Sequence, residues 1–444
     1  MKKILIKNAT IVNEGSQLEG DVLVEGEYIS SIGNALSHPN AEVIDAQGKY
    51  LIPGVIDDQV HFREPGLTHK GTIATESRAG LAGGITSYIE QPNTIPQTVT
   101  IAALEDKMAI ANASSFSNYS FNFGGTNDNL EELKRLDKKA CAGVKLFLGS
   151  STGNMLVDDQ QVLESIFKST EMIISAHCED EQIIRTNMEL YKERYGEDIP
   201  MSSHPLIRSA EACYLSSSNA IALAKKTKAR LHIFHVSTAK ETTLFRNDIP
   251  LKEKRITAEV CTHHLWFCNE DYSEKGSFIK WNPAVKTAQD REALWEALND
   301  DRIDVLATDH APHTLEEKNN VYTSAPSGGP LVQHSLVALL EKQKEGKISL
   351  TRLIEKMCHN PAILFNIEKR GFIREGYYAD LVLVDPSKSW KVTKENIAYK
   401  CGWSPFEGIE FSSAVTHCFV NGHLGYENGR FSAVRNAKRL TFER

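Results

Sequence analysis

The sequence lacks any uninterrupted apolar run near the length of about 20 residues that a membrane-spanning helix requires. Its first residues, MKKILIKNATIV, alternate like a β-strand and contain no apolar core of a signal peptide. We therefore expect no membrane association and no export, and we take the cytoplasm as the compartment.

Paired cysteine motifs and basic blocks are also missing. None of the 8 cysteines forms a C-x-x-C pair, and a chain of 444 residues does not need disulfides to fold, so we interpret them as mostly reduced core residues. The net charge is -8 and both signs are well mixed, which argues against nucleic acid as a partner. An acidic protein that binds an anionic substrate needs local positive charge, from a metal ion or an arginine.

A dinucleotide-type glycine fingerprint is absent as well, although apolar strand-like runs alternate with helical patterns from residue 53 onward. This alternation predicts a (β/α)8 barrel rather than a doubly wound sheet. The expected barrel strands are Gly54–Val60, Ile85–Glu90, Ser117–Phe123, Gly143–Leu148, Met172–Ala176, Arg230–His235, Ile256–Cys261 and Ile303–Ala307. Helical stretches between them include Leu130–Leu136, Asp158–Thr170, Ser209–Lys226 and Asp290–Leu298.

Both ends of the chain consist of shorter strand patterns separated by glycine turns. The expected strands are Ile4–Val12, Asp21–Val24, Tyr28–Ile32, Val43–Leu51, Leu381–Val384 and Ala414–Val420, with a final hairpin near Gly422–Phe431. We predict that residues 1–52 and 367–444 form one smaller β-sandwich domain beside a barrel of residues 53–366.

Five residues of metal-ligand type stand at or near the ends of the predicted barrel strands. They are His61, Lys145, His177, His235 and Asp309. Because the carboxyl ends of barrel strands meet on one rim, such side chains can converge on one metal from distant positions. The pattern indicates a metal-dependent hydrolase, in which a carboxylate such as Asp309 holds a metal-bound water and accepts its proton.

Lys145 lies inside an apolar strand, where an unpaired ammonium group is costly. Three interpretations stay open at this stage. It is an edge lysine that reaches solvent, a buried catalytic lysine, or a lysine converted to a carbamate that bridges two cations with its anionic oxygens.

Several nearby residues have both a functional and a structural interpretation. Arg63 either clamps a substrate carboxylate or pairs with Glu64 or Glu76 at the surface. His313 either reaches the substrate or caps the following helix. His232 is expected to be structural, and the adjacent pair His263 and His264 is left out of the site because consecutive strand residues point to opposite faces.

Together these residues resemble the amidohydrolase superfamily and, within it, the bacterial-type dihydroorotases. The resemblance runs nearly from end to end and rests on motifs that occur in the same order. They are Pro53-Gly54-Val55-Ile56-Asp57, His61-Phe62-Arg63-Glu64-Pro65-Gly66, Glu90-Gln91-Pro92-Asn93-Thr94, Val144-Lys145-Leu146-Phe147, His232-Ile233-Phe234-His235-Val236-Ser237, Thr308-Asp309-His310-Ala311-Pro312-His313-Thr314 and Gly376-Tyr377-Tyr378-Ala379-Asp380-Leu381-Val382.

The resemblance implies reversible cyclisation of N-carbamoyl-L-aspartate to L-dihydroorotate, a step of de novo pyrimidine synthesis, through a metal-bound hydroxide. It implies one or two Zn²⁺ ions and a role for each matching residue. The metal ligands would be His61, Lys145 as a carbamate, His177, His235 and Asp309, and Asp309 would also be the general acid and base. The substrate contacts would be Arg63, Asn93, Asn282, His313 and, in a lid at residues 149–153, Thr152.

Two departures from the family pattern stand out. Gln59 occupies the place of the first histidine in the usual His-x-His of strand one, and an amide is a poorer zinc ligand than imidazole. We therefore expect a weakened metal position there, or a single metal. The run Gly329-Pro330-Leu331-Val332-Gln333-His334 replaces the Gly-Leu-Glu-Thr of many relatives, which affects the expected shape of the substrate pocket.

Three alternatives compete with this interpretation. The nearest is another cyclic amidohydrolase, an allantoinase or a dihydropyrimidinase, whose uncharged ring would not need the clamp of Arg63 and Asn93. The second is a non-catalytic homologue that scaffolds a partner enzyme, and the third is an inert barrel with incidental histidines. The sequence leaves the oligomeric state open, with a homodimer as the working assumption.

Overall fold

The computed structural model describes residues 2–149 and 155–444, and within them eight parallel strands form a barrel in the order β6 to β13. The strands are β6 (Val55–Val60), β7 (Ile85–Glu90), β8 (Asn118–Gly124), β9 (Gly143–Phe147), β10 (Ile174–His177), β11 (Leu231–Ile233), β12 (Ile256–Cys261) and β13 (Val305–Ala307). The first and last strands meet where the backbone N–H of His61 donates to the carbonyl of His310, at 2.7 Å.

Helices connect the barrel strands and continue after the last of them. They are α1 (Ile73–Ala82), α2 (Ile101–Ser114), α3 (Leu130–Arg135), α4 (Gln160–Ser169), α5 (Glu181–Tyr195), α6 (His204–Ile207), α7 (Ala210–Thr227), α8 (Ala239–Thr242), α9 (Thr262–Trp266), α10 (Tyr272–Lys275), α11 (Ala288–Asn299), α12 (Leu315–Lys318), α13 (Ser335–Lys344), α14 (Leu350–Ile354) and α15 (Asn360–Phe365). Several start at a hydroxyl side chain that accepts a backbone N–H, as at Thr72, Ser209 and Thr287. Each such cap contributes about 1 kcal/mol and fixes where its helix begins.

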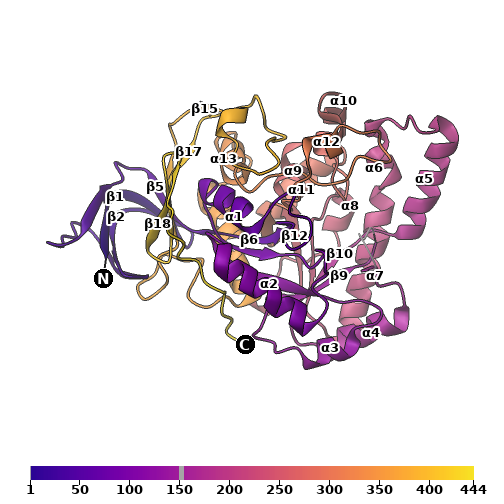
Figure 1. Cartoon of the computed structure of the whole chain (residues 1–444), viewed down its shortest axis with the longest axis horizontal. Coiled ribbons are helices and arrows are strands. Elements are labelled where there is room, and N and C mark those ends of the chain that lie inside the picture. Colours follow the sequence, from indigo (N-terminus) through magenta and orange to yellow (C-terminus); the bar gives the residue numbers. More distant parts are fainter. Residues whose placement is uncertain (1, 150–154) are drawn as a thin grey trace.

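The two chain ends build a second sheet, as predicted. Its strands are β1 (Lys3–Asn13), β2 (Ser16–Glu25), β3 (Tyr28–Gly33), β4 (Glu42–Asp45), β5 (Tyr50–Pro53), β14 (Leu381–Asp385), β17 (Ala414–Val420), β18 (His423–Glu427) and β19 (Arg430–Phe431). A separate pair, β15 (Trp390–Lys391) and β16 (Glu410–Phe411), lies between β14 and β17 in the sequence. Figure 1 shows the indigo N-terminal strands beside the yellow C-terminal ones, at one end of the molecule and next to the barrel.

The predicted fold class, a parallel barrel with a β domain made from both chain ends, is confirmed. One expected strand, Val43–Leu51, is two strands, β4 and β5, because Gln47 and Gly48 both adopt a positive φ and turn the chain between them. The domain boundaries at residues 52 and 367 stay a prediction. No helix in the described ranges is both long and apolar enough to cross a bilayer.

The barrel strands are buried along nearly their whole length. This burial is typical of parallel strands that are covered by helices on one side and by packed side chains on the other. The strand ends therefore bring residues that are far apart in the sequence to one rim, where the candidate site lies.

Candidate active site

A cavity of about 240 Å³ opens at the carboxyl ends of the barrel strands. Its walls contain every predicted site residue except Thr152, which lies outside the described residues. These are His61, Arg63, Asn93, Lys145, His177, His235, Asn282, Asp309 and His313. A larger cavity of about 870 Å³ lies between α1 and the β15–β16 region. No histidine occurs among its described lining residues, so the metal-type chemistry belongs to the smaller cavity.

His177 and His235 form one half of a candidate metal centre. His177 Nδ1 lies 2.9 Å from His235 Nε2, and His177 Nε2 lies 2.9 Å from a carboxylate oxygen of Glu179. Burial raises the pKa of Glu179, but Arg208 and His177 outweigh this effect and hold it at about 2. An ionised carboxylate only accepts, so His177 donates from Nε2 and directs its Nδ1 lone pair toward His235.

His61 and Asp309 form the other half. His61 Nδ1 lies 2.8 Å from the amide oxygen of Asn93, which can only accept, so His61 carries its proton on Nδ1. Burial lowers the pKa of His61, which keeps the ring neutral. Its Nε2 lone pair therefore faces an oxygen of Asp309 at 3.2 Å.

Lys145 is buried between these two halves of the cavity wall. Its Nζ has no hydrogen-bond partner in the described part of the chain and lies 4.0 Å from the ring centroid of Phe234. Burial lowers the pKa of Lys145 to about 7. The burial of Lys145 excludes an edge lysine that reaches solvent. Its lowered pKa favours the neutral amine, which is the form that adds CO₂ to become a carbamate.

These residues fit a metal ion. Ligand atoms that bind one ion at about 2.0–2.2 Å lie about 3.0–3.5 Å from one another. The atom pairs described above, at 2.9 and 3.2 Å, are close to this spacing, and the lone pairs of His177 Nδ1 and His61 Nε2 point into them. A carbamate on Lys145 would add oxygen ligands between them.

Another part of the cavity wall contains a buried cation. Arg63 is buried, and its Nε donates to the carbonyl of Pro312 at 3.0 Å while its Nη2 lies 3.0 Å from His313 Nε2. Lys70 Nζ lies 3.1 Å from the other ring nitrogen of His313. Burial lowers the pKa of Arg63 to about 10, so its guanidinium stays protonated at neutral pH. The surface ion pair considered for Arg63 is therefore excluded.

Three site residues adopt backbone conformations that are unusual for side chains other than glycine. The φ angles are +73° at Arg63, +43° at His235 and +48° at Asp309. Such positions cost of order 1–3 kcal/mol each and persist only where the surrounding structure holds them. All three lie two or three residues beyond the end of a barrel strand and line the cavity, so the unusual backbone conformation occurs where the chain turns at the rim.

The comparisons with known proteins agree with this geometry. The model of the amidohydrolase family matches residues 50–425. A dihydroorotase of Halobacterium salinarum is 36% identical over 391 residues, which are 87% of this chain and 89% of that protein. A dihydroorotase of Bacillus subtilis is 33% identical over 435 residues, 96% of this chain and 99% of that protein. The chain belongs to the amidohydrolase family.

Solved structures of other amidohydrolases share this fold. An L-hydantoinase (dihydropyrimidinase) from Arthrobacter aurescens is 28% identical with a TM-score of 0.94, covering 99% of this chain and 100% of its own. A dihydropyrimidinase from Brevibacillus agri is 25% identical with a TM-score of 0.88, and both chains are covered completely. The protein is a metal-dependent cyclic amidohydrolase, and the predicted family is confirmed.

Gln59 lies in the wall of this amidohydrolase site and contacts Cys261. Its amide oxygen lies 3.7 Å from Cys261 Sγ, which is the donor of that contact. The sequence predicts that His263 and His264, which follow Cys261, continue its strand, and this prediction is wrong. They lie in helix α9, where His263 stacks on Trp281 at 4.3 Å between ring centroids.

The sequence did not reveal Glu179, Arg208 and Lys70. They do not line the cavity but contact, directly or through one another, the site residues His177 and His313. Glu179 fixes the tautomer of His177 and pairs with Arg208, while Lys70 contacts His313. The signal for Glu179 was its position two residues after a histidine at a strand end. The sequence carries no comparable signal for Arg208 or Lys70.

Proposed function

We propose that this amidohydrolase is a dihydroorotase, which interconverts N-carbamoyl-L-aspartate and L-dihydroorotate in de novo pyrimidine synthesis. The observation that carries the proposal is the buried guanidinium of Arg63, which lines the same cavity as the candidate metal ligands. The ring of L-dihydroorotate carries a free carboxylate, and a buried arginine recognises such a group through charge-assisted hydrogen bonds. The dihydroorotases among its relatives support the same substrate.

The residues that would hold the metal are His61, His177, His235, Asp309 and a carbamylated Lys145. Imidazole ligands favour zinc, although manganese or cobalt can substitute. A bound ion would supply Lewis acidity that polarises the scissile carbonyl and lowers the pKa of a water. Glu179 contributes by keeping the Nδ1 lone pair of His177 directed toward the site.

Asp309 would move the proton. In ring opening its carboxylate takes a proton from the attacking water and returns it to the departing ring nitrogen. In ring closure it removes a proton from the ureido nitrogen. Its strained backbone and its contact with His61 hold this carboxylate at the edge of the cavity.

Arg63 and Asn93 would hold the substrate carboxylate, with His313 and Asn282 against the ring. Asn93 uses its amide oxygen for His61, which leaves its NH₂ group as the donor for the substrate. A fixed carboxylate makes ring closure effectively unimolecular and favours the reacting geometry. Thr152 stays a predicted further contact, and a homodimer stays a prediction.

Hydrolysis of a cyclic ureide without a carboxylate is the second candidate. The similarity to the Arthrobacter hydantoinase, with a TM-score of 0.94, favours it. The same metal ligands and Asp309 would serve that reaction. Only the cationic wall around Arg63 would then have no function in binding.

Steady-state hydrolysis distinguishes these candidates. The zinc-replete protein is assayed with L-dihydroorotate, dihydrouracil, hydantoin and allantoin, with a chelator-treated sample as control. We expect chelator-sensitive turnover, with kcat/KM for L-dihydroorotate at least about 30-fold above the others, the lower bound for a buried charge pair. Preference for an uncharged ring would overturn the proposal. No turnover on any substrate would favour the non-catalytic scaffold.

A further inference from the structure

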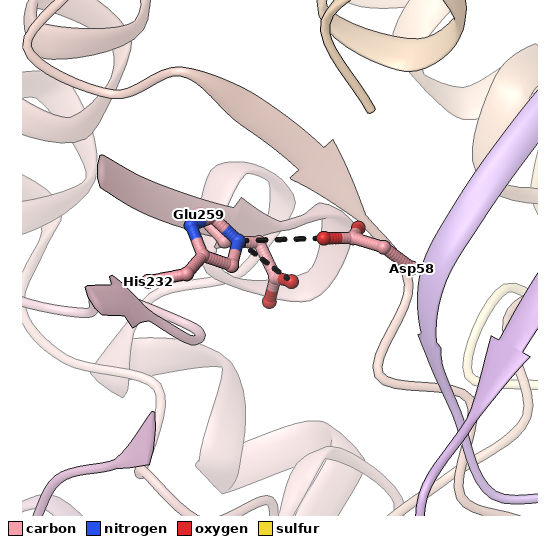
Figure 2. A group of neighbouring side chains, drawn as sticks. All are labelled: Asp58, His232 and Glu259. Carbon is pink, nitrogen blue, oxygen red and sulfur yellow. Dashed lines mark ion pairs between the residues drawn. The ribbon is translucent and has the colours of Figure 1, made fainter. Parts of the chain in front are cut away.

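A second cluster of ligand-type side chains lies inside the barrel, apart from the cavity. It consists of Asp58 on β6, His232 on β11 and Glu259 on β12, all three fully buried. Figure 2 shows the two carboxylates directed at one nitrogen of the imidazole ring. His232 Nε2 lies 3.3 Å from an oxygen of Asp58 and 3.8 Å from an oxygen of Glu259.

The converging atoms have no other hydrogen-bond partners among the described residues. This holds for both oxygens of Asp58, for Glu259 Oε2 and for His232 Nε2. Buried polar groups are normally paired, and unpaired buried charges cost several kcal/mol. A positive charge between them would remove this cost.

Thr257 fixes one hydrogen of the His232 ring. Its hydroxyl lies 2.8 Å from His232 Nδ1 and 3.4 Å from the carbonyl of Leu231, to which it donates. The hydroxyl therefore accepts a hydrogen bond from Nδ1–H, so a neutral His232 would present its Nε2 lone pair to the two carboxylates. A hydrogen bond that fixes the tautomer in this way is typical of metal-bound imidazole.

A proton on Nε2 is the alternative cation, and the distances argue against it. Burial lowers the pKa of His232, but the two carboxylates outweigh this effect and raise it to about 9, so their field favours a cation. Charge-assisted hydrogen bonds are about 2.7–2.9 Å long, however, and both contacts are longer. The Asp58 contact at 3.3 Å instead matches the spacing of about 3.0–3.5 Å between two ligands of one ion.

We propose that Asp58, His232 and Glu259 bind a divalent cation of the zinc or manganese class, separate from the metal centre at the rim of the barrel. One imidazole nitrogen and two carboxylate oxygens suit such ions. The second oxygen of Asp58 is available as a fourth ligand.

This ion would also support the active site. Glu259 Oε1 accepts the backbone N–H of His235 at 3.0 Å and lies 3.4 Å from Cys261 Sγ. An ion on the other oxygen fixes the carboxylate that holds the strained backbone of His235. The buried ion is thus a positioning element for a residue of the cavity.

Anomalous diffraction from crystals of the zinc-loaded wild-type protein tests the proposal without any mutation. We expect a peak between Asp58, His232 and Glu259 in addition to the peak at the rim. A map with only the rim peak, and with His232 directly hydrogen-bonded to Asp58, would show an imidazolium instead and overturn the proposal.

Metal content provides a second test. Asp58→Asn should bind one equivalent of metal less than the wild type while it keeps the rim metal. Asp57→Asn is the matched control, because Asp57 is the preceding residue and pairs with the Thr308 hydroxyl at 2.6 Å rather than with the triad. Equal loss in both variants, or no loss in Asp58→Asn, would contradict the proposal.

Discussion

On the proposed dihydroorotase function, replacing Arg63 with methionine should abolish the preference for a carboxylated ring over an uncharged one. The variant keeps an unbranched, flexible stem but removes a buried cation that is 7% exposed. Loss of one partner from a buried, hydrogen-bonded charge pair costs about 2–5 kcal/mol. This energy corresponds to a decrease of about 30- to 5000-fold in kcat/KM for L-dihydroorotate.

The uncharged substrate supplies the internal reference. Dihydrouracil has no carboxylate, so its kcat/KM should change by less than about threefold, within the range of an indirect effect. The two substrates are compared on the same preparations, and metal content is measured in each. Equal losses on both substrates would refute the reasoning, because Arg63 would then act through the support it gives to Pro312 and His313.

Arg63→Lys is the control for charge alone. It keeps a cation in the wall but loses the planar donor fork, so it should fall between the wild type and the methionine variant. A lysine variant as impaired as the methionine variant would assign the effect to geometry rather than to charge.

Four further outcomes are expected. Asp309→Asn should lower kcat by about 10²- to 10⁴-fold with metal still bound, and near-native kcat would exclude the proton-transfer role. Lys145→Ala should lose the rim metal and activity together, with partial rescue of both by short carboxylic acids; stoichiometric rim metal in that variant would argue against a bridging carbamate. Gln59→His should raise metal occupancy of the purified protein, and unchanged occupancy would mean that the rim metal does not use this position. Burial lowers the pKa of His334 from 6.5 to about 3, so only the unfolded chain binds this proton at pH 4 to 6. The stability that the buried neutral ring of His334 contributes is complete above pH 6.5 and decreases as pH falls, by about 1.4 kcal/mol per pH unit. His334→Gln should flatten this acid slope in denaturant titrations, and an unchanged slope would disprove the assignment.

The order of the barrel strands and the rim site could be predicted because two simple regularities coincide. Parallel strands in a barrel read as apolar runs, and their carboxyl ends share one rim. A ligand-type residue at the end of such a run, as at His177 and His235, therefore indicates a position in space. The helices between these runs could be predicted from the periodic spacing of apolar residues and from a capping residue.

The groups that orient these residues could not be predicted in the same way. Arg208 pairs with Glu179 from the segment between α6 and α7, and Lys70 reaches His313 from the loop that follows β6. No periodic pattern governs such loops, so their side chains are placed by tertiary packing. The separation of His263 from the site has the same origin, because the chain turns into α9 directly after β12.

The triad of Asp58, His232 and Glu259 depends on an irregularity in β6, which cannot be predicted from the regular alternation of side chains along a strand. Asp58 and Gln59 are consecutive, and in a regular strand they would point to opposite faces. Both nevertheless contact side chains of β12, Asp58 beside Glu259 and Gln59 beside Cys261. The pairing of β6 with β7 shifts register between Asp57 and Val60, and such an irregularity re-aims side chains. The departure from the family pattern at Gln59 therefore occurs where the strand is irregular, and the same irregularity brings an additional carboxylate into the barrel interior.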